Sequence, residues 1–99
     1  MNKLYYVTLE NCCHYMVFKM WAASEEDAEA MALATDDVKR GQAEETEYGE
    51  TWCDANGVPF NPAEYVYVVK EVCEADSDNP EQIDKNIGAP VLVEAGPRG

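Results

Sequence analysis

The chain has 99 residues, of which 20 are acidic and 7 basic, so its formal net charge at pH 7 is -13. Direct binding to DNA, RNA or an anionic membrane is disfavoured, because each needs clustered Lys and Arg and the basic residues here are scattered. A disordered acidic tail is also disfavoured, since 46% of the residues are hydrophobic and 10% aromatic. We expect one folded domain over residues 1–99, with a frayed C-terminal tail from about residue 95.

The N-terminal segment predicts a β-hairpin. Residues 4–10 alternate in the manner of a strand, with Tyr5, Val7 and Leu9 on one face. Residues 15–23 form a second such segment. Its apolar face comprises Met16, Phe18, Met20 and Ala22. The short link between the two segments favours an antiparallel connection.

A helix is predicted from about residue 25 to residue 39. The Ser24 hydroxyl can cap its N-terminus, and the three acids that follow suit the positive end of the helix dipole. The residues expected to be buried share one helical face: Ala28, Met31, Ala32, Thr35 and Val38. Lys39, Arg40 and Gly41 are expected to end the helix.

The second half of the chain predicts further strands. Residues 42–47 are polar and predict a loop, and residues 48–53 and 58–60 flank Asn56-Gly57, a strong hairpin signal. Residues 65–73 are apolar on both faces and predict a central strand under the helix. Residues 75–82 predict a loop, and residues 91–94 a short edge strand. The expected fold is therefore α+β: a small antiparallel sheet of three to five strands with one helix packed on one face, in a ββαβ-type core.

The segment Val17-Phe18-Lys19-Met20-Trp21-Ala22-Ala23-Ser24-Glu25-Glu26-Asp27-Ala28-Glu29-Ala30 resembles the strand-to-helix junction of small phage- and plasmid-borne ββαβ proteins. With the first hairpin, this resemblance covers about a third of the chain and implies an origin in a mobile element. The acidity of the chain also resembles that of anti-CRISPR proteins and other DNA mimics, which share a charge strategy rather than a motif.

Catalysis and metal binding are not expected from the residue inventory. The chain has a single histidine, His14, and no sequence pattern places an orienting residue beside it and Cys12, so we expect no enzyme. The candidate ligands of a zinc site are Cys12, Cys13, His14, Cys53 and Cys73. They lack the usual Cys-x2–4-Cys pairs. Residues 76–81 resemble the start of a calcium-binding loop, but the later positions of such a loop are not matched. We expect neither a metal nor a cofactor.

The cytoplasm is the expected location. The first residues lead into a strand pattern rather than a signal peptide, and no apolar run approaches the ~18–20 residues of a membrane span. The four cysteines are expected to be thiols, because that compartment is reducing.

Acidic residues dominate residues 41–84, which hold twelve carboxylates and one basic side chain, Lys70. Tyr48 and Trp52 lie among these acids, and on a strand they would form one row with Glu50, which either packs in the core or faces a partner. The second reading is favoured, because an unpaired buried carboxylate is costly. The predicted partner-binding residues are Glu44, Glu45, Glu47, Tyr48, Glu50, Trp52, Asp54, Glu74, Asp76, Asp78, Glu81 and Asp84.

The function expected from this surface is inhibition. The acids would occupy the basic nucleic-acid groove of a defence or replication protein, with a phage anti-CRISPR against a CRISPR effector as the most specific form. The alternative is a small interaction adaptor that uses an aromatic patch, with the acids serving solubility.

Overall fold

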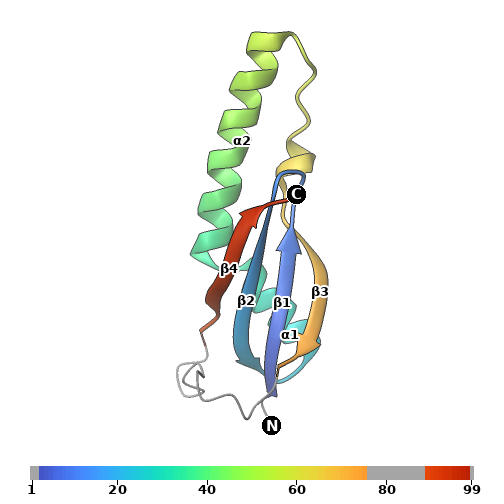
Figure 1. Cartoon of the computed structure of the whole chain (residues 1–99), viewed down its shortest axis with the longest axis vertical. Coiled ribbons are helices and arrows are strands. Elements are labelled where there is room, and N and C mark those ends of the chain that lie inside the picture. The colour runs from blue at the N-terminus through green and yellow to red at the C-terminus, as the bar shows by residue number, and fades with distance from the viewer. Residues whose placement is uncertain (1–2, 76–88, 99) are drawn as a thin grey trace.

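The computed structural model describes residues 3–75 and 89–98. Within them the elements follow one another as β1 (Lys3–Glu10), β2 (His14–Ala22), α1 (Glu25–Leu33), α2 (Asp36–Asn56), the 3-10 turn η1 (Pro62–Tyr65), β3 (Val68–Glu74) and β4 (Val91–Pro97). Figure 1 shows an elongated molecule, in which α2 extends well beyond one end of the sheet. The extents along the principal axes are 51 × 21 × 20 Å.

The predicted N-terminal hairpin is confirmed. β1 and β2 pair antiparallel from Lys3 opposite Ala22 to Glu10 opposite Tyr15. The alternation puts the predicted apolar residues on one face, where Val7 and Phe18 are fully buried.

In the part of the chain that the structure describes, the sheet has four antiparallel strands in the order β3-β1-β2-β4, which confirms the α+β class. The prediction that residues 65–73 form a central strand is wrong, because β3 begins only at Val68 and lies at an edge, paired with β1. Its apolar residues are not buried on both faces: Val68 is 55% exposed. Residues 62–65 instead form η1, at whose start the Asn61 Oδ1 accepts from the Ala63 amide at 3.2 Å.

The edge strand predicted at residues 91–94 exists and is longer than expected. β4 pairs with β2 as far as Pro97 opposite His14. The residues expected to be frayed from about 95 are thus held in the sheet, and beyond them the Arg98 amide donates to the Cys13 carbonyl at 2.9 Å.

One predicted helix is in fact two. α1 begins as expected, with the Asp27 amide donating to the Ser24 hydroxyl at 3.1 Å. It ends at Leu33, because Thr35 caps a new helix by accepting from the Val38 amide at 3.3 Å. Of the five residues predicted to be buried, Ala28, Ala32 and Val38 are buried, whereas Met31 and Thr35 are only partly buried.

The predictions for residues 42–60 are wrong. Residues 42–47 are helical rather than a loop, residues 48–53 are helical rather than a strand, and residues 58–60 form no strand. The hairpin signal at Asn56-Gly57 ends α2 instead, since Gly57 adopts a left-handed φ of 67° that also suits a helix C-terminus. Lys39, Arg40 and Gly41 therefore lie inside α2 rather than at a helix end.

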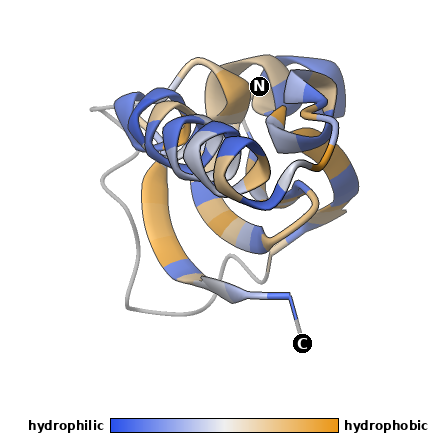
Figure 2. Cartoon of the chain, turned by 90° about the horizontal axis from the view of Figure 1, so that it is seen from above, coloured by the Kyte–Doolittle hydropathy of each residue, from blue (hydrophilic) through white to orange (hydrophobic). Residues whose placement is uncertain are grey.

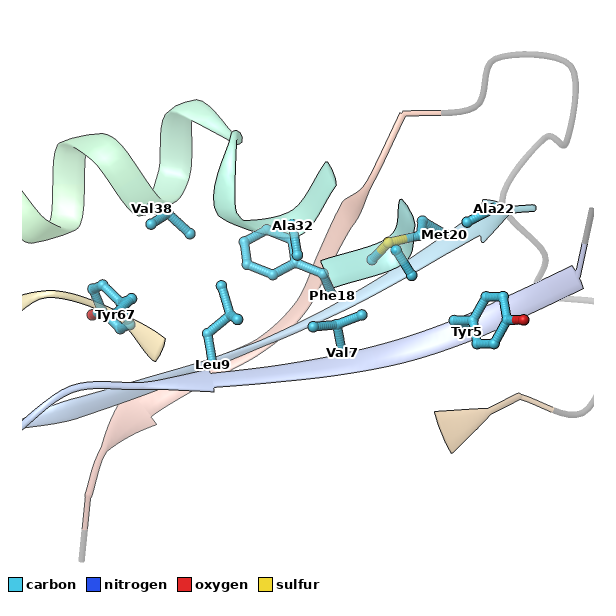
Figure 3. Packing of buried hydrophobic residues seen from close by; sticks show 10 residues of the cluster. Tyr5, Val7, Leu9, Phe18, Met20, Ala22, Ala32, Val38 and Tyr67 are labelled. Carbon is cyan, nitrogen blue, oxygen red and sulfur yellow. The ribbon is translucent and has the colours of Figure 1, made fainter. Parts of the chain in front are cut away.

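The core lies between the sheet and α1. Figure 3 shows side chains from β1 and β2 pointing toward Ala32 of α1 and Val38 at the start of α2. Leu9, Phe18 and Met20 are completely buried there. The main contacts of α2 are with η1, so its outer half, from residue 45 to residue 56, lies beyond this core. Among the described residues, no helix has the length and apolar character needed to cross a membrane.

Candidate protein-binding site

The β1–β2 turn is fixed by Asn11, a buried residue that is only 4% exposed. Its Oδ1 accepts hydrogen bonds from the Cys13 amide at 3.0 Å and the His14 amide at 2.8 Å. Its Nδ2 donates to the Tyr65 carbonyl at 3.2 Å and to Glu45 Oε2 at 2.5 Å. One side chain therefore joins the turn to both η1 and α2.

Glu45 is the carboxylate that points inward from α2. Its side chain is only 15% exposed. Oε1 accepts from the Tyr67 hydroxyl at 3.1 Å and contacts His14 Nδ1, while Oε2 is held by Asn11. These partners offset the cost of burying a charge. Burial, together with the Glu45 carboxylate, raises the pKa of Tyr67 above its ordinary value.

Gly49 lets α2 approach η1 closely. A Cβ at this position would overlap the hydroxyl and ring of Tyr65. Tyr65 in turn stacks on Phe60, with ring centroids 5.8 Å apart. Glycine in a helix costs about 1 kcal/mol relative to alanine, so its presence at this position is explained by the ring that lies against it.

A pocket of about 420 Å³ opens between α2, the β1–β2 turn and η1. Aromatic side chains from two elements line it: Tyr48 and Trp52 from α2 and Tyr65 from η1. Cys13, His14, Glu44, Glu45 and Gly49 complete the lining. Tyr48 is 73% exposed and Trp52 is 49% exposed, so both present their rings to solvent as well as to the pocket.

The predicted row of Tyr48, Glu50 and Trp52 does not form. Residues two apart share a face on a strand but not on a helix. On α2, Tyr48 and Trp52 are four residues apart and lie together at the pocket, whereas Glu50 belongs to a different face.

A different row, made of acidic residues, lies on the outer face of α2. Glu47, Glu50 and Asp54 have helical spacing i, i+3 and i+7, and all three are exposed. From residue 41 to residue 56, α2 holds five acids and no basic residue. Blue, the hydrophilic end of the scale, accordingly predominates along α2 in Figure 2.

Of the predicted binding acids between residues 74 and 84, the structure describes only Glu74, and it does not lie with the acids of α2. Glu74 lies at the opposite end of the sheet, where it pairs with Lys3 at 2.9 Å. Figure 1 shows that end beside the N-terminus, far from the outer half of α2. Four predicted binding residues lie outside the described residues: Asp76, Asp78, Glu81 and Asp84.

The single histidine lies against a carboxylate that the sequence did not reveal, because its Nδ1 contacts Glu45. No hydrogen bond joins His14 to a thiol in the described part of the chain. Instead, the Sγ atoms of Cys12 and Cys13 approach one another at 3.1 Å. Burial, the Cys13 thiol and nearby carboxylates raise the pKa of Cys12 to about 12, which disfavours its nucleophilic form.

All four cysteines are free thiols. Within residues 3–75 and 89–98, no three His, Cys, Asp or Glu side chains converge on a metal position. The calcium-like segment from residue 76 to residue 81 falls outside the described residues.

Comparison of the chain with protein-family models, with curated proteins and with solved structures found no match.

Sequence reasoning missed the residues that build the site's scaffold: Asn11, Gly49, Tyr65 and Tyr67. Asn11 gave the strongest signal, because an Asn at a hairpin link is able to accept from amides two and three residues ahead. Gly49 gave a second one, since a glycine inside a helical segment commonly marks a close approach. That signal becomes readable only after the segment is recognised as a helix.

Proposed function

We propose that this protein is an inhibitor that binds a basic, nucleic-acid-binding protein through the outer half of α2. The observation that carries the proposal is the exposed row of Glu47, Glu50 and Asp54, on a helix that extends past its own sheet and carries Tyr48 and Trp52 on another face. A helix about 10–12 Å across can enter a groove that accepts a nucleic-acid strand.

A property of the whole chain and a property of α2 support the proposal. A net charge of -13 steers the chain toward a basic surface and away from nucleic acid itself. Rigid aromatic side chains are the usual anchors of protein interfaces, and Tyr48 and Trp52 are exposed beside the acids. The acids would replace phosphates, and the two rings would add contacts that a field of charge alone does not supply.

The most specific form of the proposal is a phage anti-CRISPR that occupies the guide or target groove of a CRISPR effector in the host cytosol. On this proposal the chain acts by occupancy rather than by catalysis, without a metal or cofactor.

The second candidate is an interaction adaptor for a partner that binds no nucleic acid. The exposure of Trp52 and Tyr48 favours it, because an aromatic pair is sufficient to anchor a protein interface. Salt separates the two candidates, since the Debye length falls from ~10 Å at 0.1 M to ~3 Å at 1 M. Charge mimicry requires an association rate that falls steeply over this range, and an adaptor does not.

The test begins with affinity capture from nuclease-treated host lysate, followed by competition between the chain and nucleic acid for the purified partner. We expect the triple variant Glu47→Lys, Glu50→Lys and Asp54→Lys to lose at least ~100-fold in affinity. The matched control reverses three scattered acids that make no ion pair among the described residues: Glu29→Lys, Glu71→Lys and Glu94→Lys. It has the same net charge and should lose far less.

Equal losses in the two triple variants would show that only the overall charge matters and would overturn the located interface. A partner that binds no nucleic acid, or that binds the chain and its nucleic acid together, would overturn inhibition by occupancy in favour of the adaptor. Thermal melts of both variants establish that each is folded.

A further inference from the structure

The pocket between α2 and η1 has the composition of a cation-binding cage. Tyr48, Trp52 and Tyr65 contribute three aromatic rings to a space of about 420 Å³. The faces of such rings carry partial negative charge and attract a cation within about 6 Å of their centres. Aromatic rings from two different elements therefore line one space that is large enough to admit a long side chain.

The two carboxylates at this pocket have different roles. Glu45 already holds Asn11, Tyr67 and His14, so its charge is committed to the scaffold. Glu44 is exposed, lines the pocket, and makes no hydrogen bond or ion pair with the residues that the structure describes. It is therefore free to pair with a ligand.

A second pocket of similar volume offers a useful contrast. It is about 400 Å³ in volume and includes Glu10, Lys70 and Arg98 in its lining. There the cations already lie beside the carboxylate, with Lys70 Nζ 3.4 Å and Arg98 Nε 3.7 Å from Glu10 Oε2. That acid has its counter-charges, whereas Glu44 has none among the described residues.

We infer that the pocket lined by Tyr48, Trp52 and Tyr65 binds an arginine side chain of the partner, with the guanidinium stacked on the rings and paired with Glu44. Arginine fits better than lysine because its head group is planar, weakly hydrated and able to stack on an aromatic face while it donates to a carboxylate. This inference rests on the proposed function, which requires a basic partner, and adds the side chain that anchors it.

The test uses N-acetyl-arginine amide as the probe and follows the Gly49 amide and the Trp52 indole N–H by NMR titration. N-acetyl-lysine amide and the neutral isostere N-acetyl-citrulline amide are titrated in parallel. We expect saturable shifts of both signals with the arginine probe, weaker binding of the lysine probe, and none of the citrulline probe.

Variants locate the site. Trp52→Ala should weaken binding of the arginine probe by ~5–30-fold, because it removes one wall of the cage. Glu44→Gln should weaken it by ~2–5-fold. Glu47→Gln, which changes the same charge on the outer face of α2, should leave it within about 1.5-fold of the original. Equal binding of citrulline, equal binding of lysine, or no effect of Trp52→Ala would each overturn the inference.

Failure of the arginine pocket and failure of the proposed function are distinguishable. If the arginine probe binds as described and no basic protein is captured, the pocket stands and the inhibitor proposal fails. Suppose instead that the chain captures a nucleic-acid-binding partner and displaces its nucleic acid through Glu47, Glu50 and Asp54, yet the Trp52→Ala variant binds this partner unchanged. The inhibitor proposal then stands and the arginine pocket is wrong.

Discussion

The core beneath α1 and the outer half of α2 are held in place by different interactions. In the core, Val7, Leu9 and Phe18 have no exposed surface. From residue 45 onward, α2 buries only Gly49 and Cys53, two small residues that contribute little apolar area. The outer half depends instead on Asn11, Glu45 and the ring of Tyr65.

Because of this difference, the apolar core supplies most of the stability, and the outer half of α2 is left available for binding. Burial of apolar side chains is non-directional and anchors the sheet, whereas a few directional hydrogen bonds set where α2 points. A helix freed from core packing can keep Tyr48 and Trp52 exposed, because the fold does not need them. Substitutions in the two regions should therefore produce different patterns of loss.

Asn11→Ala should lower stability more than any single substitution in the glycines of α2 or at Tyr67. It removes four hydrogen bonds and deprives the half-buried Glu45 of one partner, so we expect the free energy of unfolding to fall by about 2–4 kcal/mol. Urea unfolding gives this value. Amide hydrogen exchange should show that α2 beyond residue 45 loses protection before the strands do.

Asn61→Ala is the matched control, since Asn61 is exposed and caps η1 through one bond to the Ala63 amide. Its cost should be about 1 kcal/mol. Unchanged exchange protection along outer α2 in the Asn11 variant would show that apolar packing, not the polar network, holds that helix.

Two glycines of α2 sharpen the comparison. A helical Gly→Ala change normally stabilises by about 1 kcal/mol. At Gly41 the new Cβ would come within 2.8 Å of the flexible end of Met16 and would otherwise make ordinary contacts with Tyr67 at 3.8 and 3.9 Å, so Gly41→Ala should be neutral or stabilising. At Gly49 it would overlap Tyr65, so Gly49→Ala should destabilise by about 1–3 kcal/mol and displace the pocket wall.

Thermal melts compare the two variants, and the double variant Gly49→Ala with Tyr65→Ala tests the cause. Once Tyr65→Ala has removed the ring, the further change Gly49→Ala should not lower the melting temperature. Equal melting temperatures of the Gly41 and Gly49 variants would contradict the close approach.

The parts of the fold that local patterns specify were predictable. The period-two alternation of residues 4–10 and 15–23 gives the hairpin, and the capping chemistry of Ser24 gives the start of α1. The order of the strands was not predictable, because an edge strand such as β3 carries valines that resemble those of a central one.

Outer α2 was mispredicted because its helical signal is weak. The residues that it turns inward include Glu45, Gly49 and Cys53, which do not form an apolar stripe. Tyr48 and Trp52 favour strands locally, and Asn56-Gly57 suits a hairpin as well as a helix end. The inward position of Glu45 depends on Asn11, 34 residues earlier, and no local pattern reports such a contact.

Tyr67→Phe should have the smallest effect, and its dependence on pH identifies the cause. At pH 7 the loss of the bond to Glu45 should cost about 0.5–1.5 kcal/mol. The pKa of Tyr67 is raised in the folded protein, so above pH ~10 the unfolded chain releases the proton while the folded chain keeps it. Wild-type stability therefore falls as pH rises, and Tyr67→Phe lacks this contribution. Unfolding free energies measured from pH 7 to pH ~11.5 should converge above pH ~10.

The raised pKa of Cys12 also lowers stability at alkaline pH, but it is present in both proteins and cancels in the comparison. Tyr48→Phe is the control, because Tyr48 is 73% exposed and its hydroxyl makes no hydrogen bond with the described residues, so its removal should cost little at pH 7. A deficit for Tyr67→Phe that stays constant up to the highest pH would mean that the Tyr67 hydroxyl is not buried against Glu45. The polar contact of α2 with the residue just before β3 would then rest on Gln42, whose Oε1 accepts from the Tyr67 amide, while Asn11 ties α2 to the β1–β2 turn.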